Sequence, residues 1–314
     1  MRVLTAIDGS KASEIVLQEA LARPWVPGTH FCLVTVVDPF FFTRAPLLFE
    51  ETKVAAGKLL HEEAQKFRTT GWETETNVGN PRKVICQCAE EWRADLVLVG
   101  SHNLNALERL ALGSTVHAVL RRTKCSVEVV RAPKKEATAG GRKILAATDG
   151  SEFSTAAVKT LASEPWPEDT RIKIISAPEF PLWLGEYPYF QRVQVEELNQ
   201  SALDAAKAAV AQAKEILSRT GLAVTTDVPI DRDAPVKTIL QKAKEWGANL
   251  IVVGSHGRRG FDRWALGSVS ESLAMNAPCS VEVVHLLANT EGKEHERESH
   301  KSERSHDEHT VHVP

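Results

Sequence analysis

The sequence predicts two consecutive α/β domains, each built on a doubly wound, five-stranded parallel sheet. Residues 81–130 recur as residues 235–284 at a constant offset of 154, with roughly half of the positions identical. A second repeat, at an offset of 141, relates residues 2–10 to residues 143–151. In each copy, continuous apolar strands alternate with helices, which is typical of a parallel sheet covered on both faces. The length of 314 residues fits two such domains.

The elements follow the same order in both copies. Each copy opens with an apolar strand that ends in Asp-Gly-Ser and leads into a helix. The strands are expected at residues 3–7, 31–37, 74–78, 96–99 and 126–130, and at 144–147, 171–175, 223–228, 250–253 and 280–284. Long amphipathic helices are expected near 50–69 and 195–220, and further helices open at Pro81 and Pro235.

We expect the first domain to cover residues 1–133 and the second to cover residues 142–288. The polar, glycine-ended segment 134–141 between them is typical of a flexible linker. Residues 289–314 are charged, rich in histidine and poor in apolar residues, so they are expected to be a disordered tail. Histidine-rich tracts can bind transition metals, but loose spacing and interspersed acidic residues favour a solvated tail over a metal site.

Composition excludes several classes of protein. The net charge is −3, with 38 basic and 41 acidic residues, so there is no basic field for nucleic acid or an anionic membrane. No apolar run is long enough for a membrane span and no signal peptide is evident, so we expect a soluble, cytoplasmic protein. The five cysteines are expected to be reduced thiols. Cys86 and Cys88 are two apart on a helix and point to different sides, which is not metal-ligand spacing.

A glycine loop follows the fourth strand of the second copy, in the pattern G-x2-G-x9-G-S. Gly254 and Gly257 allow a sharp turn that brings bare N–H groups close to an anionic ligand. Gly267 and Ser268 start a helix, where free amides and the helix dipole favour phosphate. We therefore hypothesise that the two glycine clusters hold a phosphate chain between them.

Two alternatives to this hypothesis stay open. Ser268-x-x-Glu271 matches a capping box, and Gly254 could serve only as a turn, so part of the pattern would exist without a ligand. Arg258, Arg259 and Arg263 could add positive charge, although arginines on an exposed loop are more often solvated.

Three motifs together resemble the universal stress protein family, over residues 1–133 and 142–285. They are Asp-Gly-Ser after the first strand, Gly-Ser-His after the fourth, and Leu-Gly-Ser before the last helix. The resemblance implies a strand order of 3-2-1-4-5, a fold like that of the adenine-nucleotide α-hydrolases, and ATP or AMP, with or without Mg²⁺, outside the carboxyl ends of strands one and four. It also implies an accessory or signalling role in the stress response, without a defined catalytic reaction.

The resemblance assigns nucleotide-binding residues in both copies. In the second copy, Asp149 would lie beside the base and ribose, Ile175 would offer backbone contacts to adenine, and the remaining residues would hold ribose and phosphates: Gly254, Gly257, Gly267 and Ser268. The corresponding residues of the first copy are Asp8, Val36, Gly100, Asn103, Gly113 and Ser114. Because Asn103 replaces a glycine and crowds the ligand, we expect the first site to be weaker. The second copy departs from the family pattern at Asp233, where the first copy has Gly79.

Further duplicated residues have simpler interpretations. No nucleophile with an orienting acid accompanies His102 and His256, so loop packing is favoured over catalysis. We expect Glu128 and Glu282 to lie on edge strands, where a charge limits uncontrolled pairing. We therefore predict neither catalytic residues nor metal ligands.

Three alternatives concern activity and assembly. No P-loop lysine motif and no evident magnesium-binding carboxylate cluster is present, so rapid turnover is not expected, while slow ATP hydrolysis stays open. A nucleotide-free interaction module is the other competitor. The family resemblance implies that the two copies pair through their last strands about a pseudo-twofold axis, with a homodimer of the whole chain left open.

Overall fold

The computed structural model describes residues 1–66, 72–101, 113–132, 141–180, 192–230, 233–258 and 266–286. The expected linker lies outside the described residues except for its last residue, Gly141, and the tail 289–314 lies outside them entirely. His102 and Asn103 lie outside them as well. Within the described part, no helix is both long and apolar enough to span a bilayer.

The ten strands of the described residues form one sheet, in the order β3-β2-β1-β4-β5-β10-β9-β6-β7-β8. The first copy supplies β1 (Arg2–Ala6), β2 (His30–Val37), β3 (Trp72–Val78), β4 (Leu96–Gly100) and β5 (Ser126–Val130). The second supplies β6 (Lys143–Ala147), β7 (Arg171–Ile175), β8 (Ala223–Asp227), β9 (Leu250–Gly254) and β10 (Ser280–Val284). The order 3-2-1-4-5 therefore occurs twice, and the predicted fold class is confirmed.

Helices cover both faces of the sheet. One face packs against α3 (Pro81–Glu91), α4 (Ser114–Arg122), α7 (Pro235–Trp246) and α8 (Ser268–Asn276). The other packs against α1 (Lys11–Ala22) and α2 (Pro46–Lys66) in the first copy, and α5 (Glu152–Ser163) and α6 (Arg192–Ser218) in the second. A short 3₁₀ helix, η1 (Pro39–Phe42), precedes α2. Apolar residues alternate between the two cores along each central strand because successive strand side chains point to opposite faces.

The Asp-Gly-Ser motif makes the turn from each first strand into its helix. Ser10 is the N-cap of α1 and Ser151 is the N-cap of α5, and each hydroxyl accepts a backbone N–H from three residues on. Gly9 and Gly150 have φ values of +77° and +79°, which favour glycine. The motif thus fixes where each helix begins and presents its aspartate at the carboxyl end of the strand.

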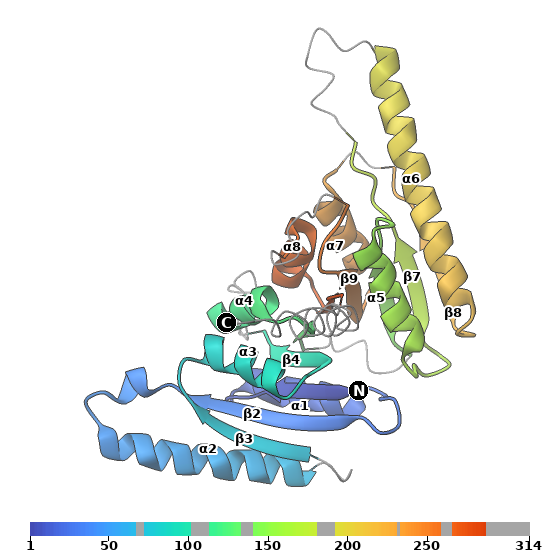
Figure 1. Cartoon of the computed structure of the whole chain (residues 1–314). Coiled ribbons are helices and arrows are strands. Elements are labelled where there is room, and N and C mark those ends of the chain that lie inside the picture. The colour runs from blue at the N-terminus through green and yellow to red at the C-terminus, as the bar shows by residue number, and fades with distance from the viewer. Residues whose placement is uncertain are drawn as a thin grey trace, which may run out of the picture.

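The two copies join through an antiparallel pairing of β5 and β10, which aligns Glu128 with Glu282. All other strand pairs are parallel. The predicted pairing through the last strands is confirmed, and Figure 1 shows the copies as two lobes, blue to teal and green to red. The edge-strand interpretation of the two glutamates was wrong. Their strands, β5 and β10, each have a neighbouring strand on both sides, whereas the edges of the sheet are β3 and β8. Glu128 is 0% exposed and Glu282 is 2% exposed.

Candidate functional site

The loop after β9 folds onto the turn after β6, at the carboxyl ends of these neighbouring strands. The backbone N–H of Arg258 donates to Asp149 Oδ2 at 3.0 Å, and Arg258 Nε donates to the Asp149 carbonyl at 2.6 Å. A Cβ placed on Gly257 would lie only 2.8 Å from Asp149 Oδ2. The structure therefore brings together Asp149 and Gly257, two of the residues that the family resemblance assigns to the site, and Arg258 adds a contact with the aspartate that the sequence did not reveal.

Asp149 is held as a carboxylate. Burial raises its pKa, but hydrogen bonds from Ser151, from the Ser154 side chain and from the Arg258 amide outweigh burial and lower the pKa below its usual value. Asp149 Oδ1 accepts the backbone N–H of Ser151 at 3.0 Å. A carboxylate attracts hydroxyl and amino donors and repels phosphate, so this side of the site suits a sugar or base.

The start of α8 forms the other side of the site. Its N-cap is Gly267, which has no side chain to cover the first amides of the helix. Ser268 lies within the helix, and Glu271 is paired with His117 and Arg121, so the capping-box alternative is not observed. Uncapped amides at the positive end of a helix favour an anion.

Two of the glycines are required by packing within the protein. A Cβ on Gly254 would lie 2.5 Å from the carbonyl carbon of Phe153, at the start of α5. A Cβ on Gly267 would lie 3.0 Å from the Ser255 carbonyl oxygen, which accepts the Gly267 N–H at 2.8 Å. Of the three loop glycines, Gly257 is therefore the one whose missing side chain bears directly on the space beside Asp149.

The two residues assigned to adenine contact are not equivalent. Ile175 pairs with Ala147 in the second copy, and the residue that pairs with Ala6 in the first copy is Val34. Val36 therefore lies two residues further along its strand than Ile175 does, because β2 runs on to Val37 whereas β7 ends at Ile175. The Ile175 carbonyl accepts the Thr148 N–H at 2.9 Å, so it takes part in joining β7 to β6.

The first copy repeats part of this arrangement. Asp8 Oδ1 accepts the Ser10 N–H at 3.0 Å and the Ser13 hydroxyl at 2.6 Å. Gly113 is the N-cap of α4 without a side-chain cap, and Ser114 begins that helix. A Cβ on Gly100 would lie 3.0 Å from Ala12. Since Asn103 lies outside the described residues, the lower affinity of this site stays a prediction.

The remaining candidates lie as follows. His256 is buried, with Nδ1 3.0 Å from the Ser255 hydroxyl and its ring 4.8 Å from that of Phe153. Asp233 is exposed and accepts a hydrogen bond from Lys237 Nζ at 2.9 Å. All five cysteines are free thiols, and burial raises the pKa of both Cys32 and Cys125 to about 12. The described residues contain no group of three His, Cys, Asp or Glu side chains suited to a metal ion.

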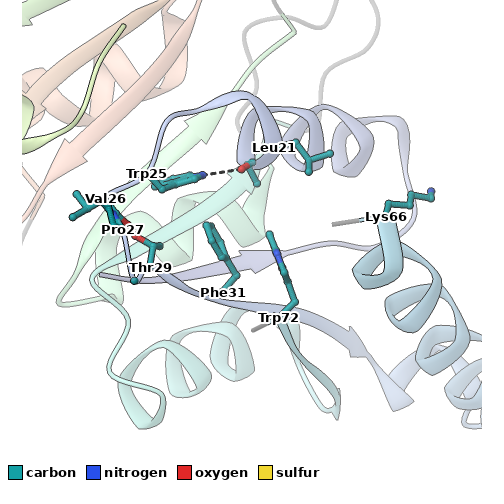
Figure 2. A pocket seen from close by; sticks show the side chains of 10 residues that line it. Leu21, Trp25, Val26, Pro27, Thr29, Phe31, Lys66 and Trp72 are labelled. Carbon is teal, nitrogen blue, oxygen red and sulfur yellow. Dashed lines mark hydrogen bonds between the residues drawn. The ribbon is translucent and has the colours of Figure 1, made fainter. Parts of the chain in front are cut away.

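A cavity of about 540 Å³ lies in the first copy, near the amino ends of strands β2 and β3 (Figure 2). Its aromatic wall is formed by Trp25, Phe31 and Trp72, and the last two rings are stacked with centroids 4.3 Å apart. Phe31 and Trp72 are at the amino ends of β2 and β3, whereas the candidate site is at the carboxyl ends of the strands. The cavity is therefore separate from the candidate site.

Fold and site together define a tandem α/β protein of the doubly wound class, with its candidate site at the carboxyl ends of its strands. The model of the universal stress protein family matches residues 1–131 and again residues 141–285. The chain belongs to the universal stress protein family, as a tandem member.

Individual relatives are similar over nearly their whole length. A universal stress protein of Mycolicibacterium smegmatis is 26% identical over 294 residues, covering 90% of this chain and 96% of the relative. One from Mycobacterium bovis is 27% identical over 292 residues, covering 86% and 92%. The crystal structure of a universal stress protein from Archaeoglobus fulgidus is 21% identical with a TM-score of 0.63, covering 90% of this chain and 98% of that one. This last likeness supports the fold.

Proposed function

We propose that the chain binds an adenine nucleotide, ATP or AMP, at the carboxyl ends of the strands of its second copy and acts as an accessory or signalling protein of the stress response. One observation carries the proposal: a carboxylate, Asp149, and the uncapped start of α8 both lie at the carboxyl ends of the neighbouring strands β6 and β9, and Gly257 packs directly against Asp149. A ligand with hydroxyl or amino donors at one end and phosphates at the other matches this pair of groups.

The contacts suggest how the nucleotide would be held. Asp149 would accept hydrogen bonds from the base or ribose, and the amides at Gly267 and Ser268 would donate to phosphate oxygens. Both Asp149 oxygens already accept backbone N–H groups, at Ser151 and Arg258. A carboxylate oxygen can accept a second hydrogen bond, so a ligand donor could share Asp149 without breaking the loop contact.

Mg²⁺ would be carried by the phosphates of the nucleotide. Mg²⁺ keeps several waters and is commonly bound through substrate phosphates and one or two carboxylates. Asp149 is the carboxylate nearest to Gly257 among the described residues, and it lies on the side assigned to base and ribose. Slow hydrolysis of ATP is the second candidate activity, and a nucleotide-free interaction module is the third.

The test begins with the purified full-length chain. The protein is denatured and any released nucleotide is identified by chromatography, and binding of ATP, AMP and GTP is then measured by calorimetry. Gly257→Ala is expected to weaken adenine-nucleotide binding at least tenfold, because the new Cβ meets Asp149. The matched control is Gly57→Ala in α2, where a Cβ meets only the Thr76 hydroxyl at 3.7 Å. Unchanged ATP and AMP binding in Gly257→Ala would contradict the assignment.

A further inference from the structure

A buried ion cluster lies where the two copies meet. Arg23 Nη1 donates to Glu128, and Arg23 Nη2 donates to Glu282 at 2.8 Å and to both carboxylate oxygens of Glu164 at 2.6 Å. The side chains of Arg23 and Glu128 are fully buried, and those of Glu164 and Glu282 are 6% and 2% exposed. A second ion pair joins the copies on the same side, from Arg142 Nη1 to Glu19 Oε1 at 2.5 Å.

Arg23 and Glu164 occupy equivalent positions in the two copies. Arg23 is the C-cap of α1, Glu164 is the C-cap of α5, and each is followed by Pro-Trp. The Arg23 guanidinium carbon lies 5.0 Å from the ring centroids of both Trp25 and Trp166. The Arg23 guanidinium therefore lies at the same distance from the equivalent tryptophans of both copies. An arginine at position 164 would contact the same two rings.

Arg23 and Glu164 thus place a basic residue and an acidic residue at equivalent positions of the two copies. A second pair of equivalent positions, at the rim of the interface, also combines a basic residue with an acidic one. His117 of α4 and Glu271 of α8 are related by the offset of 154 and lie 2.8 Å apart, from Nε2 to Oε1. Arg121 Nε is 3.0 Å from the same Glu271 oxygen. At this pair of positions, the first copy supplies His117 and the nearby Arg121, and the second copy supplies the carboxylate.

We infer that opposite charges at equivalent positions make the first copy select the second copy as its partner, and exclude pairing between two second copies. The partner that this surface fits is a second-copy domain, either in the same chain or in another chain. The strand pairing alone gives no such selection, since β5 and β10 have the identical sequence Ser-Val-Glu-Val-Val.

Counting charges shows how the selection works. Two second copies would bury two Glu164 and two Glu282 carboxylates without the Arg23 guanidinium that contacts both residues here, and Arg142, the arginine that the second copy carries nearby, would lose its partner Glu19, so this pairing is unfavourable. Two first copies would balance two Arg23 against two Glu128 in the centre, but the rim would bring together two sets of His117 and Arg121. Since every chain contains one of each copy, each pairing of first copies would also leave a second copy unpaired.

Exchanging the two equivalent side chains tests the inference on the full-length protein. Arg23→Glu places four carboxylates in the centre and is expected to lower the urea midpoint greatly. The double variant Arg23→Glu/Glu164→Arg restores one arginine and three carboxylates to the centre, with positions 23 and 164 exchanged, and is expected to regain most of the loss. If Arg23 merely fills space in the first copy, the double variant will be no more stable than Arg23→Glu, which would overturn the inference.

Two further measurements keep the test decisive. The matched control reverses an exposed pair within the first copy, Glu90→Lys/Lys124→Glu, and should leave the midpoint unchanged. If neither central variant folds, the rim pair decides. Glu271→Lys should lower the midpoint and speed hydrogen exchange in β5 and β10, and His117→Glu/Glu271→Lys should reverse part of both effects. Failure of the rim double variant to improve on Glu271→Lys would count against the inference.

Discussion

Glu128 and Glu282 face each other in register across β5 and β10, buried at the centre of the sheet. Burial raises the pKa of Glu128 to about 8, and the charge of Arg23 opposes part of that rise. Burial likewise raises the pKa of Glu164 to about 7, again against the charge of Arg23. The join between the copies therefore holds protons at a pH where exposed carboxyls have lost theirs.

The first prediction is that this join weakens the fold as the pH rises. Between pH 5 and pH 8 the folded Glu128 binds more protons than the unfolded one, so the free energy of unfolding falls with rising pH. The contribution is at most about 4 kcal/mol. Urea unfolding from pH 5 to pH 8 should show a shallower fall for Glu128→Gln than for the unmodified chain. Equal slopes would show that Glu128 keeps no extra proton.

The second prediction is that His285 makes the fold less stable as the pH falls, which is opposite to the effect of Glu128. Burial, and then the neighbouring His256, lower the pKa of His285 to about 4. The unfolded histidine therefore binds more protons below its usual pKa of 6.5, and the free energy of unfolding falls as the pH falls from 6.5 to 4. The loss at pH 5 is about 2 kcal/mol. In urea unfolding at pH 7 and pH 5, His285→Gln should lose less stability on acidification than the unmodified chain does.

How far the sequence predicts the fold depends on what each signal measures. Strand order and helix starts follow from local patterns, such as the Asp-Gly-Ser turn that places Ser10 and Ser151 as N-caps. The burial of Glu128 and Glu282 depends on a partner strand far away in the sequence, and an apolar strand containing one glutamate looks the same at an edge and in the interior. The ion pairs of Arg23 could not be predicted either, because its partners are far away in the sequence and its position at the end of α1 does not indicate them.

The candidate site was predictable to a similar extent. The motifs located Asp149, Gly257 and the start of α8 on the correct elements, because glycine and aspartate directly after an apolar strand mark the turn at its carboxyl end. The two-residue shift between Val36 and Ile175 arose because the equivalent strands differ in length, which composition does not reveal. The contact of Arg258 with Asp149 required the loop conformation itself.

The third prediction compares the two aspartates that open the copies. Asp149→Asn keeps the shape of the side chain and removes its charge, so a hydrogen bond from ribose or base becomes weaker. Loss of a charge-assisted hydrogen bond costs about 1–2 kcal/mol, or roughly a tenfold weaker affinity for ATP by calorimetry. Asp8→Asn is the matched control and should change the affinity of the stronger site little. A larger loss in Asp8→Asn would place the stronger site in the first copy.

The last prediction is the stoichiometry of nucleotide binding. The second copy has glycine at all three loop positions, whereas the first copy has Asn103 at the middle one. A Cβ at the equivalent Gly257 would lie within 2.8 Å of Asp149 Oδ2, so a side chain at this position competes with the space beside the aspartate. We therefore expect one tight site per chain, in the second copy, and a weak or silent site in the first.

Calorimetry on three full-length proteins separates the two sites. The unmodified chain should bind close to one ATP, and Asn103→Gly should gain a second binding event, because the replacement removes the side chain that crowds the first site. Gly257→Asn transfers that same side chain to the second copy and should weaken the tight site at least tenfold. Because the two variants exchange the same pair of residues between equivalent loops, the prediction fails if Gly257→Asn binds ATP as tightly as the unmodified chain, or if Asn103→Gly gains nothing.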